Sequence, residues 1–312
     1  MSYRMNSDEP VPHAIRRIAR EEIDAAIDAI DNSKIDAHQT VHQVRKRCKK
    51  IRGLIRLFRP HLQDTYEVEN VWYRNAARRL SYVRDAQSLI ETYDLLMDHY
   101  EEEVDRQSFG PIRRKLTLRL NKIADDEAGL QHRLTKFRAR MEEGRERIPY
   151  WQLDNLEPQD LVDGLTKTYG RACEAAITVY KKPSSERFHD WRKRVKYHWY
   201  HMRIVRPVWE REATTRGKDS DVLAGLLGDD HDLAIFRETL QKEPDEFSGQ
   251  ETVDILCKLS KLQQQELRAQ AKPLGLRLFA ESPKKFSKRF GAYFKAWQTD
   301  RCDQPEEELV AA

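Results

Sequence analysis

The stretch VHQVRKRCKKIRGLIRLFRP at residues 41–60 returns 147 residues later as FHDWRKRVKYHWYHMRIVRP at residues 188–207. Eight positions are identical at this offset: His42/His189, Arg45/Arg192, Lys46/Lys193, Arg47/Arg194, Lys49/Lys196, Arg56/Arg203, Arg59/Arg206 and Pro60/Pro207. The register continues without a gap through Ala77/Ala224, Leu80/Leu227 and Asp85/Asp232. A fixed offset over more than forty residues indicates internal duplication. Most of the repeated residues are cationic, so we expect the duplicated element to bind something strongly negative.

Each stretch has the spacing of an amphipathic helix with an apolar and a basic stripe. The apolar stripe of the first copy is Val44, Cys48, Ile51, Ile55 and Phe58, and that of the second is Trp191, Val195, Met202 and Val205. About 100° around the helix, the basic stripes are His42, Arg45, Lys49, Arg52, Arg56 and Arg59, and His189, Arg192, Lys196 and Arg203. Because each basic stripe flanks the apolar one, we expect the cations to line a groove or a gap between helices.

The basic stripes lack the acidic neighbours that other helices of this chain have. Residues 37–63 contain eight Lys or Arg and no acid, and residues 191–209 contain six Lys or Arg and no acid. Opposite charges one helical turn apart stabilise a helix, so their omission in both copies favours an external anion. Arg offers a planar fork of donors to phosphate oxygens and Lys a compact charge, a mixture suited to an extended polyanion.

Apolar residues recur at helical spacing through most of the chain, and the pattern predicts an all-α fold. The expected helices are at about 12–30, 40–59, 66–99 (bent near 81–85), 111–143, 158–180, 186–206, 220–241, 251–270 and 283–297. Residues 144–158 are expected to connect a first helical repeat, 10–145, with a second, 158–300. Residues 301–312 are expected to form an acidic, disordered tail.

Composition favours a cytoplasmic protein and excludes a membrane span. Of 312 residues, 35% are charged, and the formal net charge of +4 is small, so the distribution of charge is more informative than its sum. No run of about 18 apolar residues is present, and the first twelve residues lack the apolar core of a signal peptide. The four cysteines, Cys48, Cys173, Cys257 and Cys302, form no CxxC pair, as expected for free thiols in a reducing compartment.

The repeated helices resemble those of the CHAD family, the conserved histidine α-helical domain. LSYVRDAQSL at 80–89 and LLGDDHDLAIF at 226–236 are similar to that family's Leu-Gly-x-x-Arg/His-Asp element, with Ser81 in place of Gly in the first copy. The resemblance covers residues 10–300 as one CHAD domain. It implies two four-helix bundles packed with pseudo-two-fold symmetry around a basic central pore.

The resemblance also implies binding of inorganic polyphosphate and, as for some members, association with polyphosphate granules. The residues that it points to are His42, Arg45, Lys46, Lys49, Arg56, His189, Arg192, Lys193, Lys196 and Arg203. The basic stripe adds Arg52, whose place is taken by Trp199 in the second copy. Arg20 and Lys167 also match at the repeat offset, and Arg171 lies one turn beyond Lys167, so these three extend the expected basic wall.

Histidines and acids have competing interpretations. His198 and His201 have the i,i+3 spacing of two metal ligands, but His198 falls on the apolar stripe, which favours a core histidine with its hydrogen bonds satisfied. His42 and His189 each open a basic helix, where a neutral ring can donate to a phosphate oxygen or to Asp85 or Asp232. For Asp85 and Asp232, a structural role in a buried ion pair between neighbouring helices is favoured. The alternative is that each acid orients a basic residue of the binding site.

No catalytic pattern is visible in the sequence. There is no Gly-rich phosphate loop, no HExxH, and no Glu-x-Glu-x-Lys entrance motif of the triphosphate tunnel domains to which many CHAD relatives are fused. We therefore predict a stand-alone, non-enzymatic polyphosphate-binding protein without catalytic residues, metal or cofactor. The alternatives are a nucleic-acid-binding protein, for which Trp191, Trp199 and Tyr200 offer stacking surfaces, and a metal-dependent phosphohydrolase that uses the histidines.

Overall fold

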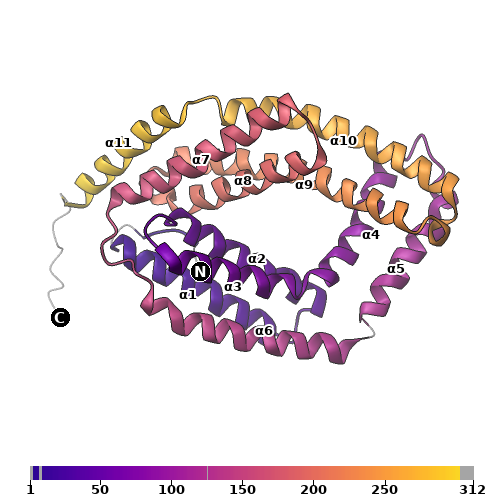
Figure 1. Cartoon of the computed structure of the whole chain (residues 1–312), viewed down its shortest axis with the longest axis horizontal. Helices are drawn as coiled ribbons and strands as arrows, with labels where there is room; N and C mark the ends of the chain where they lie inside the picture. Colours follow the sequence, from indigo (N-terminus) through magenta and orange to yellow (C-terminus); the bar gives the residue numbers. More distant parts are fainter. Residues whose placement is uncertain (1–2, 7–8, 125, 303–312) are drawn as a thin grey trace, which may run out of the picture.

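The structure is a computed structural model that describes residues 3–6, 9–124 and 126–302 (Figure 1). The described part contains eleven α-helices and no strands, which confirms the predicted all-α class. The helices are α1 (Val11–Asp31), α2 (Ala37–Leu57), α3 (Gln63–Arg78), α4 (Ser81–His99), α5 (Gly110–Ala124), α6 (Glu127–Arg147), α7 (Pro158–Lys181), α8 (Ser185–Ile204), α9 (Glu210–Lys242), α10 (Gln250–Leu278) and α11 (Pro283–Cys302).

The two repeated stretches form α2 and α8, and both have a side-chain cap at the N-terminus. The Asp36 carboxylate accepts a hydrogen bond from the Gln39 amide, which starts α2 three residues earlier than predicted. The Ser184 hydroxyl caps α8 in the same way through the Arg187 amide. Every residue of the predicted apolar stripes is fully buried, so the stripe that faces the core was identified correctly.

Two long helices expected from the sequence are each divided in two. The predicted helix 66–99 ends at Arg78 and restarts at Ser81, so the expected bend is a break between α3 and α4. The predicted helix 111–143 is divided into α5 and α6, and the Asp126 side chain caps α6 at the Gly129 amide. By contrast, α9 is one continuous helix of 33 residues that begins ten residues before the expected start at 220.

Three apolar clusters hold these helices together. The largest combines α1, α2, α3 and α6 with α11, the first half of α7 and the C-terminal end of α8. A second cluster lies among α7, α8, α9 and α10. Two of the three clusters, including the distal one described next, contain residues from both predicted repeats.

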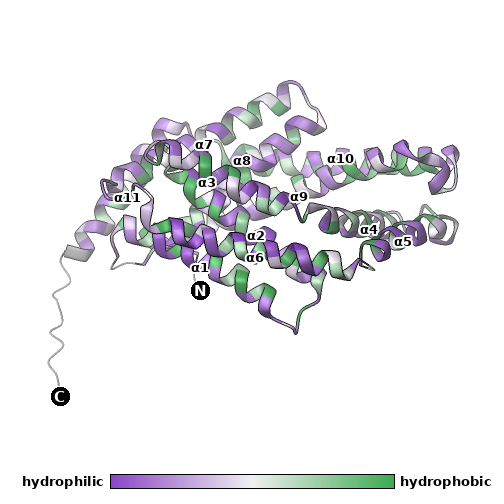
Figure 2. Ribbon diagram, turned by 60° about the horizontal axis from the view of Figure 1, so that its bottom comes forward, coloured by the Kyte–Doolittle hydropathy of each residue, from purple (hydrophilic) through white to green (hydrophobic). Residues whose placement is uncertain are grey.

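The distal bundle is formed by α4, α5, the C-terminal half of α9 and the N-terminal half of α10. Figure 2 shows it as an arm that extends from the rest of the molecule. Tyr93, Leu96 and Met97 of α4 are fully buried against residues such as Phe236 and Leu240 of α9. The first half of the chain therefore relies on the second half to bury the apolar face of α4.

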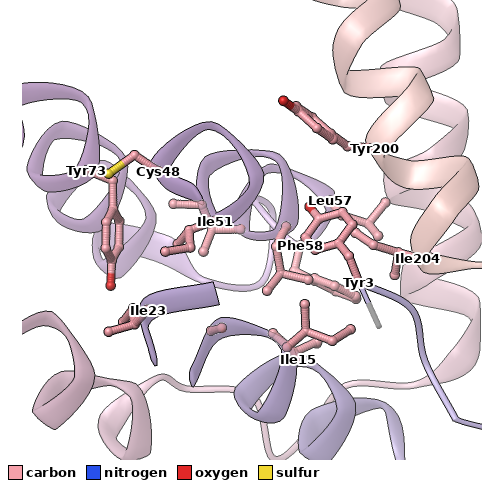
Figure 3. Packing of buried hydrophobic residues seen from close by; sticks show 14 of the residues in the cluster. Tyr3, Ile15, Ile23, Cys48, Ile51, Leu57, Phe58, Tyr73, Tyr200 and Ile204 are labelled. Atoms are coloured by element: carbon pink, nitrogen blue, oxygen red, sulfur yellow. The ribbon is translucent and has the colours of Figure 1, made fainter. Parts of the chain in front are cut away.

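The N-terminal residues also join the two halves. The Tyr3 hydroxyl donates to the Lys50 carbonyl at 2.7 Å, and the Met5 amide donates to the Ile204 carbonyl at 3.0 Å. Figure 3 shows the Tyr3 ring among Leu57, Phe58 and Ile204. This short segment therefore connects the C-terminal ends of α2 and α8.

Three smaller expectations concern membranes, thiols and the tail. Across the described ranges, no helix has both the length and the apolar character needed to cross a membrane. Cys48, Cys173 and Cys257 are free thiols. Of the predicted tail 301–312, the first two residues end α11, and residues 303–312 lie outside the described residues.

Candidate anion-binding site

Side chains of α8 pack directly on the backbone of α2 at Gly53. A Cβ atom placed on Gly53 of α2 would lie 3.0 Å from Cδ2 of Tyr200 in α8, so only glycine leaves ordinary space there. The Nε2 atom of the next residue, His201, lies 2.9 Å from the Gly53 carbonyl oxygen, which accepts the hydrogen bond. The close approach places the basic stripes of the two helices beside each other.

We call the cations gathered near this contact the central basic cluster, whose members are Arg45, Lys46 and Lys49 of α2, Arg84 of α4, and Arg192 and Lys196 of α8. Lys49 interacts electrostatically with Arg45, Arg84, Arg192 and Lys196. Lys196 in turn interacts with Lys46. Residues of both sequence copies therefore share one electrostatic environment.

The crowding of positive charge is visible in the two lysines. Lys49 keeps contact with solvent, yet partial removal from bulk water and then the neighbouring cations lower its pKa to about 8. Burial and Arg192 lower the pKa of Lys196 to about 8 as well, although Asp221, with Oδ1 3.7 Å from Nζ, opposes the shift. Burial is the larger cause of both shifts and the neighbouring cations add to it, while Asp221 beside Lys196 and Glu91, 2.8 Å from Arg84, compensate part of the positive charge.

The two equivalent arginines are held by different means. Arg45 donates from Nη1 to the Ala77 carbonyl, at 2.8 Å, where α3 is about to end. Arg192 lies against Gly228 of α9. A Cβ atom added to Gly228 would be only 3.1 Å from the Nη2 atom of Arg192. The glycine of the LLGDDHD segment therefore makes room for a guanidinium. Ser81 replaces it in the first copy, where the arginine has a carbonyl partner instead.

The histidines that open the basic helices flank the central basic cluster. Burial, followed by Arg84, Lys46 and Lys49, lowers the pKa of His42, so its ring is neutral near pH 7. Burial and then His231 lower the pKa of His189 to about 4, and the two rings have centroids 3.9 Å apart. These shifts agree with the neutral rings expected from the sequence, and a neutral ring retains one N–H donor.

A second group of cations lines a pocket of about 600 Å³ between α2, α7 and α8, which we call the outer basic pocket. Its cationic residues are Arg52, Arg56, Arg59, Arg171, Arg187, Lys193 and Arg194. The acids that line it are Glu174 and Asp190, and Asp190 pairs with Lys193. Burial and then Arg194 and Arg56 lower the pKa of Arg171. The predicted basic stripe of α2 therefore contributes to two neighbouring sites.

Some of the cations in the acid-free windows are neutralised by acids of other helices. Glu22 of α1 is buried and accepts from Lys50 at 2.6 Å and from Arg47 at 3.0 Å. Arg59 pairs with Glu67 at 2.9 Å, whereas Arg52 donates to the uncharged Asn70 side chain at 3.0 Å, which leaves its charge uncompensated. Sequence spacing could not show these partners. The positive charge that has no acidic partner is therefore smaller than the sequence suggested. It is concentrated in the central basic cluster and the outer basic pocket.

The remaining expected residues are not brought into the central basic cluster. Arg203 lies over the Trp199 ring, 5.2 Å from its centroid, and over Tyr3. Arg20 and Lys167 are exposed, and the side chain of neither forms a hydrogen bond or an ion pair with another described residue. Of the three residues proposed to extend the wall, the structure therefore gathers only Arg171 with other members of the predicted set.

Two interpretations of polar residues need correction. His198 is in the core as predicted, among Tyr169, Phe279 and Phe286, but neither ring nitrogen has a hydrogen-bond partner among the described residues, so it is not satisfied. The buried ion pair expected for Asp85 and Asp232 is wrong, since Asp85 is exposed and neither acid lies within ion-pair distance of a described cation. The buried pair on α9 is Asp230 with Arg268 of α10, at 2.6 Å.

The sequence analysis missed Arg84, Arg187, Arg194 and His231 as site residues. Arg84 and His231 occupy the same place in the two copies of the Leu-Gly-x-x-Arg/His-Asp element, which was the available signal. Within the described residues, no group of three or more His, Cys, Asp or Glu could hold a metal ion. Cations predominate among the charged side chains of both sites, although Asp221, Glu174 and Asp190 also lie there.

Fold and site together define an all-helical protein in which cations of two helices with related sequences, α2 and α8, lie close to one another. The chain belongs to the CHAD domain family, whose sequence model matches residues 17–241. This confirms the resemblance seen in the sequence. Among curated proteins, none matches this chain.

Proposed function

We propose that this protein binds inorganic polyphosphate through the central basic cluster and the outer basic pocket. In this proposal the two sites belong to one basic pore or surface lined by Lys, Arg and His of both repeats. The repeats would be two duplicated four-helix bundles related by pseudo-two-fold symmetry. The observation that carries the proposal is the packing of α8 on α2 at Gly53, which brings Lys49 of α2 near Arg192 and Lys196 of α8.

A polyanion suits this arrangement better than a single small anion. Cations of one sign held close together repel one another, and a ligand with regularly spaced negative charge relieves the repulsion at several points at once. The Nε atoms of Arg56 and Arg192 are buried without a hydrogen-bond partner among the described residues, so the protein does not satisfy all the donors of these two guanidinium groups.

Salt dependence tests the polyanion part of the proposal. Binding to many phosphates releases condensed counterions, and single-stranded nucleic acids give a log–log slope of roughly −0.7 per phosphate contacted. We expect polyphosphate of about a hundred units to show a slope of several such increments, by analogy with nucleic acids. A slope near zero, or equal affinity for orthophosphate, would remove this function.

A nucleic acid is the second candidate, and aromatic side chains beside the cations favour it. The Lys196 Nζ atom lies 3.7 Å from the Trp199 ring centroid, and Arg56 lies 4.3 Å from that of Tyr197. Bases stack on such rings in proteins that bind single strands. Long-chain polyphosphate, single-stranded DNA, duplex DNA and heparin should be compared as competitors at one near-physiological salt concentration, and we expect polyphosphate to compete best.

The same proposal makes the protein a binding protein and not an enzyme, so polyphosphate should keep its length when incubated with it. The assay includes Mg²⁺, Mn²⁺ or Zn²⁺ in turn. Sustained release of phosphate that is abolished by His198→Ala or His201→Ala would support the phosphohydrolase alternative. We further propose a cytoplasmic location at polyphosphate granules, which a fluorescent fusion can test by its overlap with a granule stain.

A further inference from the structure

A further cationic pocket, which shares no lining residue with the sites above, lies between the end of α3 and one face of α6. Its volume is about 400 Å³. It is lined by Ala76, Arg79 and Leu80 at the α3–α4 junction and by Gly129, His132, Arg133, Lys136, Phe137 and Arg140 of α6. We call it the α3–α6 pocket. Its size falls in the range of small-molecule sites, which begins at about 300 Å³.

The cations of this pocket lack the acidic partners that the other arginines of α6 have. Arg138 pairs with Asp31, Arg145 with Asp24 and Arg147 with Glu69. In contrast, the pocket's own cations, Arg79, Arg133, Lys136 and Arg140, have no carboxylate within ion-pair distance in the part of the chain that the structure describes. The charge left uncompensated on α6 is therefore confined to the residues that line the pocket.

Two of the guanidinium groups are held in place on aromatic rings. Arg140 lies 3.9 Å from the Trp72 ring centroid, and Arg133 lies 5.2 Å from that of Tyr82. The Nε atom of Arg140 is buried and has no hydrogen-bond partner among the described residues. Burial and then Arg79 lower the pKa of Arg140, and Glu143 opposes this shift only in part. Donors fixed in this way lose little entropy when they bind an anion.

Part of the pocket lining is apolar, since the buried residues Ala76, Leu80 and Phe137 contribute to it. An inorganic anion would leave the apolar part of the lining without a contact. An apolar molecule would leave the charge of the four cations uncompensated. We propose that the α3–α6 pocket binds a small organic phosphate, in which phosphate groups are joined to a flat, weakly polar body as in a nucleotide. This site is separate from the polyphosphate site and does not depend on that function.

Calorimetric titration of the full chain with four probes tests both halves of the recognition. ATP and AMP carry phosphate and a flat body, adenosine carries only the body, and pyrophosphate carries only the phosphate. We expect ATP and AMP to bind at least tenfold more tightly than adenosine and pyrophosphate. Equal affinity for pyrophosphate and ATP would overturn the proposed ligand class, and so would the absence of measurable nucleotide binding.

Variants locate the site. Lys136→Glu and Arg133→Glu change exposed side chains and should each reduce ATP affinity at least tenfold, with circular dichroism as the folding check. Lys136→Gln serves as a milder variant if a reversed charge disturbs α6. Lys258→Glu, an exposed lysine of α10, is the matched control. Nucleotide binding that is lost in Lys49→Glu but retained in Lys136→Glu would show that the nucleotide occupies the central basic cluster, and the proposal would fail.

Discussion

The ring of Tyr200 lies on Gly53, and these two residues are separated in the chain by 147 positions, the offset of the sequence repeat. Equivalent positions of the two copies therefore touch each other. The contact is reinforced by His201, which donates to the Gly53 carbonyl oxygen. Because α2 and α8 approach this closely, Lys49 comes within electrostatic range of Arg192.

The first prediction concerns this contact. Gly53→Val should lower stability by about 1–3 kcal/mol because its side chain would overlap Tyr200, despite valine's better helix propensity. It should also weaken polyphosphate binding, since α2 and α8 would separate. Gly225→Ala in α9 is the control, because nothing lies within 4 Å of its added Cβ atom, and we expect it to raise stability by up to about 1 kcal/mol. Urea unfolding measures both effects.

The second prediction is that both copies contribute to one binding site. Lys49→Glu and Lys196→Glu should each weaken binding of a chain of about a hundred phosphates at least tenfold, about 1.4 kcal/mol. The loss follows because a long ligand touches both helices, so each half raises the effective concentration of the other. Lys258→Glu in the distal bundle makes the same charge change and should have little effect. Full affinity in only one of the two site variants would contradict a shared site.

Affinity for polyphosphate should fall as the pH rises from 7 to 9. Lys49 and Lys196 have pKa values lowered to about 8, so they are charged below that pH and lose their protons above it. A polyanion favours the charged form, and binding near pH 8 should therefore take up protons. The double variant Lys49→Arg/Lys196→Arg stays charged and should flatten the profile. An unchanged slope in that variant would assign the pH dependence to other groups.

A fourth prediction concerns acid stability. Burial lowers the pKa of His201 from 6.5 to about 4 and that of His198 well below 6.5. The folded pKa lies below the unfolded value, so between about pH 4 and 6.5 the unfolded state binds more protons and stability falls as the pH falls. The lowered pKa of His201 alone should make the free energy of unfolding about 2 kcal/mol smaller at pH 5 than at pH 7.5.

The His198→Phe variant tests this origin. Phenylalanine suits the aromatic surroundings of Tyr169, Phe279 and Phe286 and removes two buried nitrogens without partners. We expect higher stability at pH 7.5 and a smaller loss between pH 7.5 and 5, measured by urea unfolding at each pH. His201→Gln keeps a donor for Gly53 and should also reduce the pH dependence. If both variants lose as much stability between pH 7.5 and 5 as the wild type, carboxylates and not these two histidines determine the acid sensitivity.

The helices and their buried stripes could be predicted because they depend on local periodicity. Val44 and Ile51 recur at helical spacing, and both are completely buried. A bend was expected at residues 81–85, but the complete break before Ser81 could not be predicted, since Ala77, Leu80 and Val83 keep helical spacing across it. The partners of the basic residues were equally hidden, because Glu22 reaches Lys50 from another helix and Arg192 depends on Gly228 from a third.

The candidate site shows the same limit. The sequence identified which cations are repeated, but their division between the central basic cluster and the outer basic pocket depends on where α8 crosses α2. Lys193 and Lys196 are one turn apart on one helix, yet Lys193 lines the pocket and Lys196 belongs to the cluster. One-dimensional spacing does not specify this crossing.

The distal bundle determines how much of the chain a truncated or fused version must contain to keep its apolar clusters covered. The family match ends at residue 241, before α10 begins at Gln250. A fragment cut at that boundary would expose the apolar faces of α4 and α9 that Val253 and Leu256 cover, and it would also lose Phe286 and Phe290 of α11 from the largest cluster. A fusion module or a minimal expression clone should therefore retain the chain through Cys302, well past the homology boundary.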